Sequence, residues 1–329
     1  MSKQLIGVPL STFGFARDGQ VPGFPANPNH PNAIPITPFA FSEGIFRMLN
    51  FAWMREVTIR QDHHPRRGLW LAGPKGAGKT TVVEQFFARL SVPVVSLTAN
   101  RHFSVQEAAQ TKTLVPTYRT EADGSKTPVG ITAIPQDGPL LQAMREGIPL
   151  VINELDLADP AELTGLNDII DRGIYTVPDT GEVVRAERGF MVFVCANSNG
   201  SGDQTGEYAG VGAMNTSLIS RFYKVEVDYP TEAEETQAVI ASGVKSTPEI
   251  IAKVVQLAKA TRDAAKNGTG IASAMSTREV IGVVEAATLF APLAASGMKP
   301  LEMAVETVYS MGLPRESRAA VKTLLKALT

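Results

Sequence analysis

One stretch of the chain matches the phosphate-binding pattern G-x-x-x-x-G-K-[ST]: Gly73-Pro74-Lys75-Gly76-Ala77-Gly78-Lys79-Thr80. Glycines let the backbone N–H groups of such a loop curl around an anion, and the helix that follows adds its partial positive charge. We expect the Lys79 ammonium to reach the β- and γ-phosphates of a nucleotide, and the Thr80 hydroxyl to bind Mg²⁺. Without its context the motif is only a glycine-rich turn. Because an apolar run precedes it and a helical pattern follows, we predict a nucleotide-binding loop that ends at Thr81.

A second apolar run, Leu150-Val151-Ile152, delivers two polar residues at its end, Asn153 and Glu154. In open parallel sheets ligands bind at the carboxyl ends of the strands, so Glu154 is the candidate base that polarises an attacking water. Asn153 stands where an Asp is usual. Its amide oxygen can accept a hydrogen bond from a metal-bound water but carries no charge, so we predict weaker Mg²⁺ dependence and slower turnover than an Asp would give. The alternative for Glu154 is an exposed carboxylate at a strand end.

Three further polar residues gain meaning only beside this loop. Asn197 follows the run Phe190–Ala196, where it could bridge the attacking water and the γ-phosphate. Arg221 ends a short helical pattern, so it is either a solvated cation favoured by the helix dipole or an arginine finger for a neighbouring subunit. Arg278 lies in the first turn of a predicted helix, where a cation is locally disfavoured. A phosphate facing Arg278 would explain that position, although a capped helix also tolerates it.

These residues are positioned by an alternation of apolar runs and helical patterns. The predicted strands are Gly68–Ala72, Val92–Leu97, Pro149–Ile152, Phe190–Ala196 and Val225–Tyr229, and the predicted helices include Ser42–Met54, Lys79–Leu90 and Pro160–Arg172. Such alternation favours a parallel sheet with helices on both faces. After Tyr229-Pro230 only helical patterns follow, two of them opened by the capping boxes at Ser246–Glu249 and Ser276–Glu279.

The chain therefore divides into three predicted parts. Seven of the 22 prolines fall in the first 40 residues, so residues 1–41 are expected to form an extended, Pro-rich arm that lacks regular structure and wraps a domain or a neighbour. Residues 42–230 form an α/β nucleotide-binding domain, in which residues 104–147 exceed an ordinary connection. Residues 231–329 form a helical domain.

Composition limits the classes of protein that the chain can represent. The formal charge is −2 and the isoelectric point is about 6.1, which argues against a protein that coats nucleic acid. Cys195 is the only cysteine, so an internal disulfide framework and a Cys-based zinc site are excluded. The first residues lack a signal-peptide core, and no run of about 18 uninterrupted apolar residues occurs. We expect a soluble, cytoplasmic protein without a membrane span.

Taken together, these motifs resemble the MoxR branch of the AAA+ ATPases, and within it the ATPase subunit of aerobic cobaltochelatases (CobS-like). The similarity runs from about residue 12 to 315. It is carried by Phe13-Gly14, Val21-Pro22, GPKGAGKT, Ile152-Asn153-Glu154-Leu155-Asp156, Ala196-Asn197-Ser198-Asn199-Gly200-Ser201-Gly202-Asp203-Gln204-Thr205-Gly206-Glu207-Tyr208, and Arg221. The glycine-rich run that ends at Tyr208 is the most family-specific of these pieces.

The resemblance implies a P-loop AAA+ core with strand order 5-1-4-3-2, a C-terminal helical lid, and a ring that is usually hexameric. It assigns Glu154 as catalytic, Asn197 as sensor one, Arg278 as sensor two and Arg221 as the finger supplied in trans. It implies ATP and Mg²⁺ as cofactors, an insert in residues 104–147, and a hairpin in 174–190 that, like the insert, faces the pore or a partner. That partner would be a protein with a von Willebrand A domain or a chelatase subunit.

Three functions remain open at this point. The first is a ring motor that hydrolyses ATP to remodel or activate a protein partner. The second is a nucleotide-gated scaffold, in which Asn153, a departure from the family's Asp, leaves ATP bound but barely hydrolysed. The third, a DNA-directed AAA+ protein, is disfavoured by the charge balance.

Overall fold

A five-stranded parallel sheet forms the centre of the protein. The computed structural model describes residues 4–60, 65–121, 124–200, 202 and 212–328. The sheet consists of β3 (Gly68–Ala72), β4 (Val95–Thr98), β7 (Leu150–Asn153), β10 (Val192–Ala196) and β11 (Phe222–Glu226). Its spatial order is β11-β3-β10-β7-β4, and every neighbouring pair is parallel. Numbered along the chain, this is the order 5-1-4-3-2, so the predicted fold class is confirmed.

Helices cover the sheet and bury large aromatic side chains against it. They are α1 (Glu43–Met54), α2 (Lys79–Arg89), α3 (Val105–Ala109), α4 (Pro139–Glu146), α5 (Leu166–Arg172) and α6 (Thr216–Ile219), with a π-helical turn, η2 (Arg55–Ile59), after α1. Phe87 of α2 lies edge-on to both Trp53 of α1 and Phe193 of β10. Burying such side chains contributes about 1.5–3 kcal/mol each, so this core fixes how α1 and α2 sit on the sheet.

Several local predictions are wrong in detail, and the strand expected over Val92–Leu97 begins only at Val95. The helix expected over Pro160–Arg172 is a 3₁₀ turn, η4 (Glu162–Gly165), followed by α5, after the shorter 3₁₀ turn η3 (Leu155–Leu157). The last strand begins three residues earlier than Val225, because Phe222 pairs with Gly68 and packs edge-on against Trp70.

The N-terminal segment was expected to lack regular structure, and that expectation is wrong. Strands β1 (Ile6–Pro9) and β2 (Gln20–Gly23) pair antiparallel, separated by the 3₁₀ turn η1 (Leu10–Phe13). Prolines are tolerated in such a ribbon because both strands are edge strands. Several of its side chains are buried in the same core as the sheet: Leu10, Phe13, Val21 and Phe24. Their burial holds the segment on the α/β domain despite its prolines.

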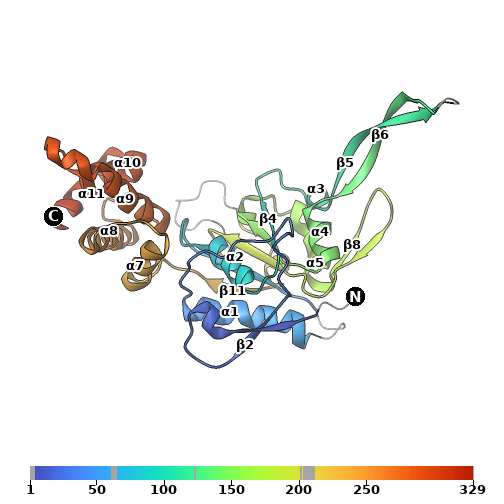
Figure 1. Ribbon diagram of the computed structural model, residues 1–329, viewed down its shortest axis with the longest axis horizontal. Helices are drawn as coiled ribbons and strands as arrows, with labels where there is room; N and C mark the ends of the chain where they lie inside the picture. The colour runs from blue at the N-terminus through green and yellow to red at the C-terminus, as the bar shows by residue number, and fades with distance from the viewer. Residues whose placement is uncertain (1–3, 61–64, 122–123, 201, 203–211, 329) are drawn as a thin grey trace.

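Two hairpins interrupt the α/β pattern. The longer one, β5 (Gln110–Thr120) and β6 (Lys126–Asp137), projects away from the sheet and ends far from it (Figure 1). Helices α3 and α4 stand at its base. The shorter one pairs β8 (Ile174–Thr176) with β9 (Val183–Arg185). The long hairpin lies within residues 104–147 and the short one within residues 174–190.

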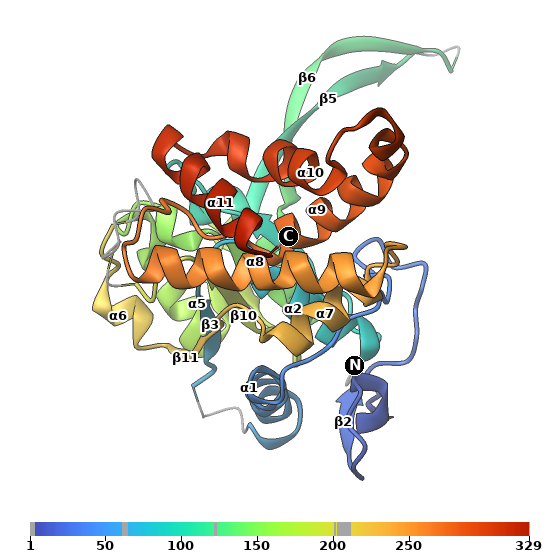
Figure 2. The same ribbon diagram turned by 90° about the vertical axis from the view of Figure 1, so that its left-hand side faces the viewer.

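The C-terminal part is entirely helical and has its own core. Its helices are α7 (Glu232–Ala241), α8 (Pro248–Lys266), α9 (Thr277–Phe290), α10 (Pro300–Val308) and α11 (Arg315–Leu328), with 3₁₀ turns η5 (Ala291–Ser296) and η6 (Ser310–Gly312). In Figure 2 the long helix α8 lies across this domain, with α9, α10 and α11 on one side and α7 on the other. The apolar core here begins at Val239, whereas the α/β core ends at Val227.

One stretch, Thr277–Ser296, is long and apolar enough to cross a membrane by length and composition alone. We did not expect this stretch from the sequence, because charged residues interrupt its apolar residues. Several side chains of α9 are nevertheless buried in the helical domain: Val280, Val283, Val284 and Ala287. In this structure one face of α9 packs into the core of that domain.

Candidate functional site

The loop between β3 and α2 is closely enclosed at two of its glycines and open at a third. A Cβ on Gly73 would lie 1.9 Å from the carbonyl oxygen of Val227, and one on Gly76 would lie 2.4 Å from the Cβ of Ser276 in the helical domain. Gly78 has open space beside it and a φ of 85°, the left-handed conformation that glycine adopts without strain. The loop thus packs against both domains while its last turn leads into α2 with room for an anion.

Lys79 is the first residue of α2, and its charge is held inside the loop. Lys79 is only 8% exposed, and its Nζ donates to the carbonyl oxygens of Gly73 (2.7 Å) and Pro74 (2.8 Å). Nζ also donates to Oδ1 of Asn197 at 3.1 Å. Burial lowers the pKa of Lys79. The structure therefore brings together two predicted site residues, one from the loop and one from the end of β10.

Thr80 and Asn153 also meet. The Thr80 hydroxyl donates to Oδ1 of Asn153 at 2.5 Å. The amide nitrogen of Asn153 donates to Oγ of Ser96 (3.1 Å) and to the carbonyl oxygen of Leu97 (3.2 Å). Because β4 accepts both amide protons, the oxygen of Asn153 is directed toward the loop.

This oxygen pair fits Mg²⁺ only with help from a nucleotide. Among the described residues no group of three His, Cys, Asp or Glu side chains could hold a metal ion. Mg²⁺ prefers oxygen ligands, keeps several waters and is commonly bound through substrate phosphates. Thr80 and Asn153 would therefore hold the ion together with phosphate oxygens.

Glu154 combines exposure with backbone strain. Its φ is 56°, one of two positive values outside glycine among the described residues, and its backbone N–H donates to the carbonyl oxygen of Cys195 at 2.7 Å. The left-handed conformation costs a non-glycine residue about 1–2 kcal/mol. Strained residues held by their surroundings cluster at functional sites. The strain thus supports the role that the sequence suggested for this exposed carboxylate.

Asp156 is a site residue to which sequence reasoning gave no role. It is 1% exposed, and its Oδ2 accepts hydrogen bonds from the backbone N–H groups of Asn197 (3.0 Å) and Ser198 (2.9 Å). Its other oxygen is buried without a partner in the described part of the chain. Asp156 thereby fixes the backbone that carries Asn197. An acidic residue among apolar neighbours two positions after Glu154 was the signal available in the sequence.

Arg221 lies where the strands of the sheet begin, whereas the loop lies at the edge where they end. Its carbonyl oxygen accepts from the N–H of Gly68, the first residue of β3, whereas the loop follows the last residue of that strand. Five residues of strand span about 16 Å. The structure therefore does not bring Arg221 to the phosphate-binding loop of its own chain.

The helical domain and the segment that leads into it both lie against the loop. The Tyr229 hydroxyl donates to the carbonyl oxygen of Lys75 at 3.3 Å, and the Arg262 guanidinium lies 4.2 Å from the centre of the Tyr229 ring. Arg262 also forms a bidentate pair with the buried carboxylate of Glu235. Arg278 is exposed on the first turn of α9, two residues after the Ser276 that touches the loop. Sensor-two chemistry at Arg278 stays a prediction.

Part of the glycine-rich run after β10 cannot be placed against this site. Residue 201 and residues 203–208, which carry much of its family resemblance, lie outside the described residues.

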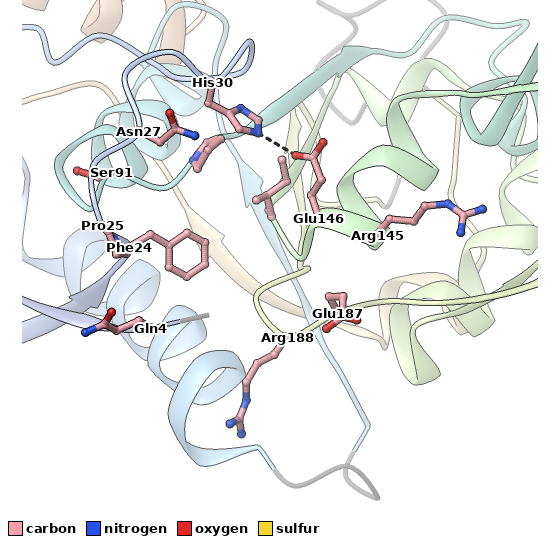
Figure 3. A pocket seen from close by; sticks show the side chains of 12 residues that line it. Gln4, Phe24, Pro25, Asn27, His30, Ser91, Arg145, Glu146, Glu187 and Arg188 are labelled. Atoms are coloured by element: carbon pink, nitrogen blue, oxygen red, sulfur yellow. Dashed lines mark hydrogen bonds and ion pairs between the residues drawn. The ribbon is translucent and has the colours of Figure 1, made fainter. Parts of the chain in front are cut away.

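A separate cavity of about 590 Å³ lies at the other edge of the sheet, where β4, β7 and β10 begin. Figure 3 shows the Phe24 ring and His30 among its walls, with His30 facing Glu146. His30 Nε2 and Glu146 Oε2 are 2.9 Å apart, and the N–H of Asn32 donates to His30 Nδ1. Nδ1 is therefore the acceptor and Nε2 carries the proton. This cavity contains none of the residues predicted from the motifs.

Residues 68–222 match the AAA domain family, dynein-related subfamily. An uncharacterized protein of Staphylococcus epidermidis is 30% identical over 242 residues, which cover 73% of this chain and 82% of the relative. The chain belongs to the AAA ATPase family. A second relative, an uncharacterized protein of Staphylococcus saprophyticus, is 29% identical over 257 residues, which cover 77% of this chain and 88% of the relative.

Among solved structures, the AAA chain is similar to the Thermotoga maritima RuvB Holliday junction branch migration motor. The identity is 12%, the TM-score is 0.48, and the alignment covers 84% of this chain and 72% of the other. Similarity at this level says nothing about shared ligands. Family membership makes this protein an ATPase in general terms, and nucleotide binding with Mg²⁺ is what that membership implies for the site.

Proposed function

We propose that the protein is a ring-forming ATPase of the MoxR branch that hydrolyses ATP to remodel or activate a protein partner. The observation that carries this is the division of the site between two edges of the sheet. Lys79, Asn197 and Glu154 stand at one edge, and Arg221 stands at the other. A protomer is therefore incomplete by itself, and an adjoining copy would supply the missing cation.

The residues divide the chemistry as follows. Lys79 exchanges the loop carbonyls for the β- and γ-phosphates, because a phosphate is a stronger acceptor than a carbonyl. Glu154 polarises the attacking water, and Asn197, fixed by Asp156, orients that water against the γ-phosphate. The partner's arginine stabilises the charge that develops on the phosphoryl oxygens. When bound, Mg²⁺ supplies charge neutralisation, with Thr80 and Asn153 as its protein ligands.

The finer assignments follow the same resemblance. We propose a hexameric, cytoplasmic ring that works with a von Willebrand A domain protein or a chelatase subunit, and a CobS-like role in metal insertion is the most specific form of this proposal. The exposed β5–β6 hairpin, which lies inside residues 104–147, supports a partner-facing insert.

A slowly hydrolysing, ATP-gated scaffold is the second candidate, and one observation favours it. The Asn153 amide nitrogen is anchored by Ser96 and Leu97 of β4, so β7 presents an uncharged oxygen to the metal position. Removing one negative charge weakens the hold on Mg²⁺ and with it the transition state.

Phosphate release by the purified protein distinguishes the two candidates. The motor predicts steady ATP turnover that Glu154→Gln reduces by about 100-fold or more while nucleotide stays bound. The scaffold predicts wild-type turnover as low as that of the variant, together with ATP-dependent assembly.

Mixed rings test the contribution in trans. Arg221→Ala should spare nucleotide binding and lose turnover, and mixing it with Glu154→Gln subunits should restore part of the activity. If mixed rings stay inactive, Arg221 does not act on a neighbour's nucleotide.

A further inference from the structure

The Arg221 guanidinium is already immobilised within its own chain. Nε lies 2.7 Å from Oδ2 of Asp171, and Nη1 donates to both Oγ (2.8 Å) and the carbonyl oxygen of Ser217. Nη2 makes no hydrogen bond with any described residue, and the side chain is 25% exposed. One edge of the guanidinium is thus held by two residues of its own chain, and among the described residues Nη2 has no such partner.

The two anchors come from different helices that are tied together. Asp171 lies in the last turn of α5, and Ser217 lies in α6. The N–H of Arg66 donates to the Asp171 carbonyl oxygen at 2.8 Å, and the Arg67 guanidinium donates to the Ser220 carbonyl oxygen at 3.1 Å. The segment before β3 therefore fixes α5 relative to the end of α6. Arg221 is therefore anchored to two helices whose relative position is fixed, and not to a loop.

We propose that Asp171 is the positioning residue of Arg221, which orients its guanidinium so that Nη2 reaches the γ-phosphate bound by the adjoining protomer. This inference rests on the proposed function. An arginine side chain has many rotamers, and a guanidinium that is ordered before the reaction loses none of this freedom in the transition state.

The same contact could instead be an inhibitory clasp. In that case the ion pair must break before Arg221 can act. Partly exposed ion pairs contribute little stability, so such a clasp could restrain activity by only about a few-fold. The two accounts also differ in sign, because removal of Asp171 lowers turnover if it positions Arg221 and raises turnover if it restrains Arg221.

The first experiment measures ATP turnover and nucleotide binding of Asp171→Ala in the full chain. We expect kcat to fall by about 10- to 100-fold, since misplacement of a reacting group by an ångström has effects of this size, while KM and nucleotide affinity stay within about twofold. Asp171→Asn keeps an oxygen that can accept from Nε, so it should recover most of the loss.

Asp168→Ala is the matched control. Asp168 lies one turn earlier on the same helix, where its side chain is 72% exposed and 3.9 Å from Arg172. This variant should turn over ATP like the wild type. Equal losses in Asp168→Ala and Asp171→Ala would assign the effect to α5 as a whole and overturn the proposal.

Mixed rings provide a readout that a merely structural role would not move. Asp171→Ala subunits keep their own loop and Glu154, whereas Glu154→Gln subunits keep a positioned Arg221. We therefore expect mixtures of the two inactive variants to regain activity, as mixtures with Arg221→Ala should.

The outcomes separate this inference from the function on which it rests. If Arg221→Ala retains full turnover, the trans-acting finger itself fails. If Arg221→Ala loses turnover while Asp171→Ala is unchanged, faster, or not rescued in mixed rings, the positioning role alone fails. Should Asp171→Ala melt well below the wild type, Asp171→Asn and the rescue experiment decide the question.

Discussion

The phosphate-binding edge of the sheet and the β5–β6 hairpin differ in what their side chains contact. At the edge, each polar side chain is held by partners from other elements. Lys79 contacts the loop and β10, and the Asn153 amide contacts the loop and β4. In the hairpin, side chains meet mainly across the two strands, as Thr117 and Thr132 do.

The hairpin also exposes large apolar side chains. Leu114 is 68% exposed and Ile131 is 72% exposed, and the strand register places both on one face with Tyr118. A two-stranded hairpin is at best marginally stable by itself, and exposed apolar faces of this kind mark interaction sites. The difference teaches that contacts within the chain hold the polar side chains at the phosphate-binding edge, whereas the hairpin leaves large apolar side chains in solvent. Variants in the two regions should therefore behave differently.

The largest expected effect is at Lys79. Lys79→Ala removes the charge that the loop holds next to Asn197 and should lower ATP affinity by at least about 100-fold, because two charge-assisted hydrogen bonds are worth roughly 3 kcal/mol or more. Fluorescent-nucleotide titration measures this. Retention of affinity within about fivefold would mean that the loop is not the phosphate site.

Asp156→Ala comes next. It leaves the N–H groups of Asn197 and Ser198 without acceptors, at about 1–3 kcal/mol each, and releases the sensor from its position. We expect turnover to fall by about 100-fold and the melting temperature to drop by several degrees. Asp156→Asn, which retains one acceptor oxygen, should lose less of both. An alanine variant with normal kinetics would remove Asp156 from the site.

Asn153→Asp should have a mixed and smaller effect. The added charge should lower the Mg²⁺ concentration needed for nucleotide binding, measured by titration in chelator-buffered solutions. The same carboxylate would face the Leu97 carbonyl oxygen, which now accepts an N–H at 3.2 Å, so the ligand-free protein should lose about 1–3 kcal/mol of stability. An unchanged Mg²⁺ requirement would show that residue 153 is remote from the metal.

The smallest effect is expected in the hairpin. Replacing Leu114 and Ile131 together by Thr keeps strand propensity and removes side chains that are mostly in solvent. Nucleotide affinity and basal turnover of the purified protein should stay within about twofold. A tenfold loss of either would break the separation between the two regions.

Sequence reasoning succeeded where the signal was local. The loop, its flanking strand and helix, and the polar ends of β7 and β10 were predicted because each depends on a few consecutive residues and on strand polarity. The strand order was predicted through the family resemblance. Helix α7 was not predicted, although Thr231 and Glu234 form a capping box at its start.

What the sequence did not reveal depends on contacts between distant segments. Asp156 and Asn197 are 41 residues apart, and Asp171 and Arg221 are 50 residues apart, so nothing in the local pattern of one member points to the other. The N-terminal ribbon was missed because proline content describes the backbone, whereas Phe13 and Val21 are held by burial in a core that other segments create.

The left-handed backbone at Glu154 implies a conflict between thermal stability and catalysis. A glycine in this place would adopt the same torsion freely, so Glu154→Gly should tolerate heat better than the native protein while being unable to cleave ATP. The chain thus keeps a side chain that its own turn disfavours, and the residue that suits this turn best has no carboxylate to polarise a water.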